Sequence, residues 1–137
     1  MLADFAQVHA GKLFVAGGGV QVAMLPIRLG VAGEIVVPWE YRSRRQQFRL
    51  DLVDADGRAV TLPSPIANAA PAPFQAVGQF EVVPAPGTPA GSELTFAFAF
   101  NVTGLPLDSG SSYKFRLFIA EEATPEATAT FATQALS

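Results

Sequence analysis

The sequence lacks cysteine, contains one histidine, and carries charge on only 15% of its residues. Without cysteine the chain forms no disulfide, no thiolate nucleophile and no cysteine-ligated zinc site. The lone His9 cannot supply the two or three imidazole ligands of a histidine-based metal site. A net charge of −3 gives no general attraction to nucleic acid or to an anionic membrane, because both need a basic surface. We therefore predict no metal, no cofactor, and no nucleic-acid or membrane partner.

Long hydrophobic runs are also missing. No stretch approaches the ~18 apolar residues of a transmembrane helix. Asp4 and Gln7 interrupt the apolar residues near the N-terminus, and no early Lys or Arg precedes them, unlike a secretory signal. The absence of cysteine suits a reducing compartment. These features predict a soluble, cytoplasmic protein.

Apolar residues that alternate with polar ones dominate the rest of the chain. Half of the residues are hydrophobic, and eleven of them are phenylalanine. Side chains alternate between the two faces of a strand, so this spacing predicts strands with one buried face. The alternating segments are 27–37, 48–52, 74–82, 94–102, 113–119 and 127–131. Eleven prolines and twelve glycines leave no room for a helix of ordinary length. Residues 1–137 are predicted to form one all-β domain, a two-sheet antiparallel β-sandwich of about seven to nine strands.

The connections between these segments also carry information. Two long proline-containing stretches, Pro63–Pro73 and Pro84–Ser92, are predicted to cross between the two sheets, since proline is excluded from central strands. The stretch "DADG", Asp54–Gly57, predicts a hairpin turn with Gly57 at positive φ. It resembles the start of a calcium loop, but no third oxygen ligand and no distal glutamate follow.

Three consecutive glycines, Gly17–Gly19, stand between two apolar stretches. A phosphate-binding loop would need a lysine, a hydroxyl and a following helix, whereas "VQVAML" follows and is typical of a strand. The triplet therefore predicts a bend, bulge or hairpin between strands.

The most unusual segment is "PWEYRSRRQQFR", Pro38–Arg49, which holds four of the nine basic residues and has the aromatic residues Trp39 and Tyr41 near its start. Arginine with aromatic residues is a frequent interface composition, and guanidinium groups bind carboxylate or phosphate. The candidate interaction surface consists of Trp39, Tyr41, Arg42, Arg44, Arg45 and Arg49. The alternative is a solvated loop before a strand, with Trp39 closing one end of the sandwich.

Two other groups of residues are candidates for catalysis. His9 could act with a serine, but no G-x-S-x-G motif is present to support such a site. The serines concerned are Ser109, Ser111 and Ser112. Three carboxylates near the C-terminus could carry acid–base chemistry in a pocket, but they are more simply solvated on a turn. They are Glu121, Glu122 and Glu126. We predict no catalytic residues.

Three stretches resemble a family of short bacterial proteins of unknown function. They are "DFAQVHAGKLFVAGGGVQ" (4–21), "VVPWEYRSRRQQFRLDLVDADGRAV" (36–60) and "LPLDSGSSYKFRLFI" (105–119). The shared features are the glycine triplet, the Pro-Trp step before a basic loop, and an acidic-acidic-glycine turn. The resemblance implies an immunoglobulin-like β-sandwich and no particular activity.

A looser similarity links the chain to immunoglobulin-type domains in general. Asp108 and Gly110 precede Tyr113 much as in the D-x-G-x-Y pattern of a tyrosine corner. The sequence departs from this pattern by one residue, because position 112 is serine. The Cys…Trp…Cys frame of antibody domains is absent as well.

These observations favour a non-catalytic interaction module of the bacterial cytosol that binds a protein partner or itself. An open sandwich has edge strands that can pair with another strand. An alternative is a structural subunit of a homo-oligomeric or phage-like assembly, suggested by the large apolar fraction and by Phe118 on an otherwise polar strand face. An enzyme is the least favoured interpretation, because it would need His9, carboxylates or a borrowed metal.

Overall fold

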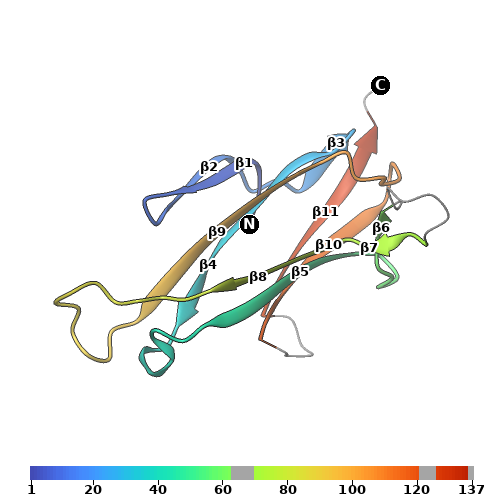
Figure 1. The fold of residues 1–137 in the computed structure, drawn as a ribbon. Helices are drawn as coiled ribbons and strands as arrows, with labels where there is room; N and C mark the ends of the chain where they lie inside the picture. The colour runs from blue at the N-terminus through green and yellow to red at the C-terminus, as the bar shows by residue number, and fades with distance from the viewer. Residues whose placement is uncertain (63–69, 121–125, 136–137) are drawn as a thin grey trace.

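The computed structural model describes residues 1–62, 70–120 and 126–135, which form strands with one three-residue helical turn (Figure 1). The strands are β1 (Leu2–His9), β2 (Lys12–Gly18), β3 (Val22–Leu25), β4 (Arg28–Val37), β5 (Gln46–Asp54), β6 (Thr61–Leu62), β7 (Ala72–Pro73), β8 (Gln75–Phe80), β9 (Leu94–Thr103), β10 (Ser112–Ile119) and β11 (Ala127–Ala135). The 3₁₀ turn η1 spans Trp39–Tyr41. All six alternating segments form strands, as the sequence predicts.

Two sheets face each other across a shared core. The four-stranded sheet has the order β2-β1-β4-β9, and the five-stranded sheet has the order β3-β11-β10-β5-β8. Leu29 and Val31 of the first sheet pack in one cluster with Leu50, Phe115 and Phe131 of the second. The two faces meet because each strand directs alternate apolar side chains inward. The all-β, two-sheet prediction is confirmed, with nine strands in these sheets and β6-β7 as a separate pair among the described residues.

One pairing departs from the antiparallel prediction. Strand β3 runs parallel to β11, with Val22 opposite Ala132 and Leu25 opposite Ala135. After β2 the chain leaves the four-stranded sheet and joins the edge of the five-stranded one. It reaches that edge travelling in the same direction as β11, which periodicity alone cannot reveal.

The two long connections behave differently. Residues 81–93 link β8 of the five-stranded sheet to β9 of the four-stranded sheet, so the predicted crossing at Pro84–Ser92 is confirmed. The crossing predicted for Pro63–Pro73 is wrong. Residues 63–69 lie outside the described residues, but the flanking strands β6 and β7 pair with each other, with Thr61 opposite Pro73. The chain therefore returns to the sheet that it left.

The glycine triplet lets the backbone bend where the chain passes from one sheet to the other. The N–H groups of Gly19 and Val20 both donate to the carbonyl of Leu2, at 2.8 and 3.0 Å. These amides are occupied and cannot bind a phosphate. Gly17 has a φ of +65°, and a Cβ atom there would overlap the Asp4 carboxylate. The predicted strand bend is confirmed.

The Asp54–Gly57 turn is likewise a hairpin. One carboxylate oxygen of Asp54 accepts the N–H groups of Asp56 and Arg58, both at 2.9 Å, and Gly57 has a φ of +79°. The returning chain forms an antiparallel bridge between Val53 and Ala59. The carboxylate thus organises its own turn.

Beyond Ala3, one side chain ties the β1–β2 hairpin to the rest of the four-stranded sheet. The Asn101 amide on β9 donates to the carbonyl of Ala6 at 2.7 Å and accepts the Ala6 N–H at 3.0 Å. Beyond Ala3, β1 no longer pairs with β4. Asn101 therefore replaces the missing strand ladder, and the hairpin extends away from the five-stranded sheet (Figure 1).

Candidate functional site

The predicted surface begins at η1, where the chain passes from β4 to β5. Trp39 is half-buried and packs against the small core cluster of Val37, Phe80 and Leu94. It closes this end of the sandwich, which agrees with the alternative interpretation of the segment. Tyr41 stays 44% exposed. The same short turn thus anchors one aromatic ring in the core and presents another to solvent.

The two rings support arginines. The Arg42 guanidinium lies 4.7 Å from the centre of the Trp39 ring and donates to the Trp39 carbonyl at 3.1 Å. The Arg44 guanidinium lies 5.6 Å from the centre of the Tyr41 ring. Such contacts restrict long side chains and leave their outer N–H groups free to bind. Arg45 is exposed and follows directly.

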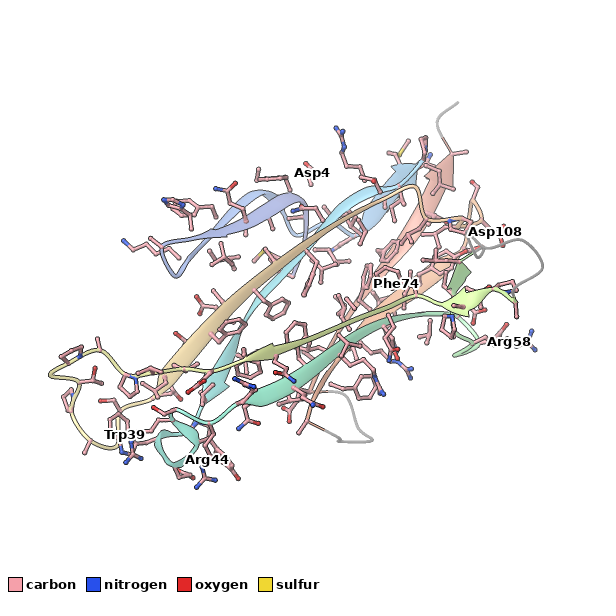
Figure 2. All side chains as sticks on the ribbon, viewed as in Figure 1. Asp4, Trp39, Arg44, Arg58, Phe74 and Asp108 are labelled. Atoms are coloured by element: carbon pink, nitrogen blue, oxygen red, sulfur yellow. The ribbon has the colours of Figure 1, made fainter. Side chains whose placement is uncertain are left out.

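These arginines have no acidic partner among residues 1–62, 70–120 and 126–135, where the salt bridge of Arg116 with Asp51 stands alone. We call Trp39, Tyr41, Arg42, Arg44 and Arg45 the η1 surface. Figure 2 shows Trp39 and Arg44 together at one end of the molecule, with Arg58 and Asp108 at the other.

Arg49 is separated from the η1 surface. Its guanidinium lies 4.2 Å from the ring centre of Phe118, its cross-strand neighbour on the outer face of the five-stranded sheet. The Arg116 guanidinium lies 5.2 Å from the same ring and forms a two-bonded pair with Asp51, at 2.8 and 2.7 Å. The hydrogen bonds that Arg116 donates to the Asp51 carboxylate raise the pKa of Arg116. Phe118 is consequently only 3% exposed, and its ring is not available as the assembly contact that the sequence suggested.

A cavity of about 610 Å³ lies beside the η1 surface and was not predicted from the sequence. Five consecutive residues of the chain, Glu34–Pro38, line it. Successive side chains point to opposite faces of a strand, so a run of five shows that the edge of β4 faces the cavity. Its apolar walls include Ile35, Phe80, Leu117 and Ile119, and Tyr41 belongs to both the cavity and the η1 surface.

The residues considered for catalysis are dispersed. His9 ends β1, is exposed, and has its ring 6.5 Å from that of Phe14. Ser109 accepts the N–H of Ala135, while Ser111 and Ser112 lie at the start of β10. No hydrogen bond joins His9 to these serines. Glu126 is exposed and lines the 610 Å³ cavity, whereas Glu121 and Glu122 lie outside the described residues.

The opposite end of the sandwich contains further hollows without a metal-binding arrangement. A cavity of about 550 Å³ is lined by Asp54, Asp56 and Asp108 among others. Within the described part of the chain, no three His, Cys, Asp or Glu side chains group as metal ligands. None of the helical structure in this part is long and apolar enough to cross a membrane.

The fold and the η1 surface together define an all-β protein that presents cations on aromatic supports beside an apolar cavity. The chain belongs to the family of unknown function DUF6941, whose family model matches residues 1–130. The predicted resemblance to a family of unknown function is therefore confirmed. No curated protein and no solved structure matches the chain.

Proposed function

We propose that this protein is a non-catalytic interaction module that binds an acidic segment of a partner protein at the η1 surface. One observation carries the proposal: Arg42 and Arg44 lie on aromatic rings, and no acidic side chain of the described residues neutralises them. A carboxylate can accept two N–H groups from one guanidinium, which makes such contacts strong and directional. The aromatic supports reduce the conformational entropy that binding would cost.

The cellular setting and the finer fold class belong to the same proposal. We place the protein in the bacterial cytoplasm, because its sequence resembles bacterial proteins and contains no cysteine. We also assign it an immunoglobulin-like sandwich. This is supported by the Tyr113 hydroxyl, which accepts the backbone N–H of Asp108 at 2.9 Å, in the manner of a tyrosine corner.

Selection from a random peptide display library tests the binding mode. The immobilised protein is expected to enrich peptides containing Asp or Glu. The triple variant Arg42→Glu/Arg44→Glu/Arg45→Glu should lose this enrichment while keeping the far-UV circular dichroism of the native protein.

A matched control has the same change in net charge at exposed positions away from η1: Lys12→Glu/Arg28→Glu/Arg58→Glu. It should enrich the same peptides as the native protein. Enrichment without acidic residues, or equal loss in both triple variants, would contradict the proposal.

A different observation supports self-assembly as a second candidate. Phe5 and Phe14 are 50% and 51% exposed. Gln7 lies opposite Phe14 and Ala16 opposite Phe5, so both rings project from the same face of the β1–β2 hairpin. Exposed apolar neighbours of this kind often mark an interface. Light scattering should show an oligomer that Phe5→Ser/Phe14→Ser dissociates. A native protein that is monomeric at high concentration would exclude this candidate.

A further inference from the structure

Along half of its length, one edge of β4 pairs with no strand of the described residues. Met1 and Ala32 exchange both backbone hydrogen bonds, each at 2.9 Å, and Leu2 and Ala3 continue the pairing away from η1. Between Gly33 and Val37, β4 pairs with β9 on one side and with no described strand on the other. Edges of this kind form hydrogen bonds readily with an added strand.

The direction of each free backbone group follows from the Met1–Ala32 pair. Backbone groups of successive residues in a strand point to opposite edges, so every second residue points to the same edge. Since Ala32 directs its N–H and carbonyl toward Met1, Glu34 and Val36 direct theirs to the same open edge. These two residues therefore offer two donors and two acceptors to an incoming strand.

The cavity lies where the inward side chains of such a strand would point. Leu2 pairs with Val31 and places its side chain in the core, where it is 3% exposed. A strand continuing the same register would place a side chain opposite Ile35 in the 610 Å³ cavity, among Leu117 and Ile119. The apolar part of the lining thus suits an apolar side chain from an added strand.

The charged groups near this edge of β4 indicate which residues an added strand should carry. A strand antiparallel to β4 has its N-terminal end beside Val37 and Tyr41, and the Arg44 guanidinium stacks on that tyrosine. Acidic residues preceding the apolar one would therefore meet the η1 surface. The residue opposite Glu34 would point outward beside its carboxylate, which favours a basic side chain there.

We infer that an extended partner segment adds to the edge of β4 between Gly33 and Val37. Acidic residues at the N-terminal end of the segment contact the η1 surface, and an apolar residue enters the cavity. The inference rests on the proposed function for the acidic end of the segment. The strand addition itself rests on the free edge and the cavity.

The probe is a fluorescein-labelled peptide, EEVTIKV, and binding is measured by fluorescence anisotropy. In the proposed register its fourth and sixth residues lie opposite Val36 and Glu34, and its fifth lies opposite Ile35. N-methylation of the fourth and sixth residues should weaken binding roughly 30-fold, because two backbone donors are lost. N-methylation of the third and fifth residues is the matched control, since their N–H groups face away from β4.

A pair of protein variants tests the same edge. Val36→Pro removes an N–H that faces the open edge and leaves the bonds to β9 intact, so the variant should fold and lose binding. Val36→Thr should bind like the native protein. Protection of the Glu34 and Val36 amides from hydrogen exchange upon peptide addition would support the inference further.

Several outcomes would overturn strand addition. They are equal weakening by both N-methylated peptides, no effect of Val36→Pro, or no binding of EEVTIKV at millimolar concentration. If only the triple arginine variant loses the peptide, acidic recognition stands and strand addition fails. If only the edge variants lose it, the acidic part of the proposed function fails. A native dimer that Val36→Pro converts to a monomer would show that a second copy occupies the edge, which also overturns the inference.

Discussion

Removing the Asn101 side chain tests how the β1–β2 hairpin is held. In Asn101→Ala the backbone N–H and carbonyl of Ala6 both lose their partner. Ala6 is fully buried, so water does not readily replace these bonds. Each bond contributes about 1 kcal/mol net, and an unsatisfied buried group adds to the loss, giving about 2 to 3 kcal/mol in the free energy of unfolding. Equilibrium urea unfolding measures this, with the single tryptophan, Trp39, as the fluorescent probe.

A second substitution at the same position separates the two bonds. Asn101→Asp keeps an acceptor for the Ala6 N–H but places a carboxylate oxygen against the Ala6 carbonyl. Protonation restores a donor there. The stability of this variant relative to the native protein should therefore rise as the pH falls through the titration of the introduced carboxyl. A loss below about 0.5 kcal/mol in Asn101→Ala, with unchanged hydrogen exchange at the Ala6 amide, would refute the reasoning.

Three further predictions concern stability. Tyr113→Phe removes one hydrogen bond to a backbone N–H and should lower the free energy of unfolding by about 1 kcal/mol, measured by urea titration. Gly78→Ala places a Cβ 2.6 Å from the Phe48 ring and should cost about 1 to 3 kcal/mol, with Phe48→Leu relieving part of it; additive losses would contradict the steric account. A double-mutant cycle on Asp51 and Arg116 should give a coupling below about 1 kcal/mol that falls with added salt, because both side chains are partly exposed; coupling insensitive to salt would contradict this.

The strands were predictable because burial on one face imposes a period of two. The segments around Phe98, Phe115 and Phe48 all form strands. Strand β1 was not predicted, since only Leu2, Ala3 and Ala6 are buried along it and they do not alternate. Beyond Ala3 its ladder runs to β2 alone, so its sequence carries little of the core pattern.

The candidate site was predictable in part. The local composition identified Trp39 and its neighbouring arginines, and these residues do lie together on and after η1. Arg49 could not be separated from them without the register of β5 against β10, which brings it to Phe118. The cavity brings Ile35 of β4 together with Leu117 and Ile119 of β10, a strand of the other sheet that is distant in the sequence. No local pattern encodes this proximity.

The parallel pairing of β3 with β11 has a consequence for the order of folding. Residues 22–25 acquire their strand partner only when residues 132–135 are in place. At a synthesis rate of about 5 to 20 residues per second, several seconds separate the synthesis of β3 from that of its partner β11. Closing so long a loop is also slow kinetically. We therefore expect β3 to pair late in folding, after β11 has been made. Until then, β3 lacks its strand partner.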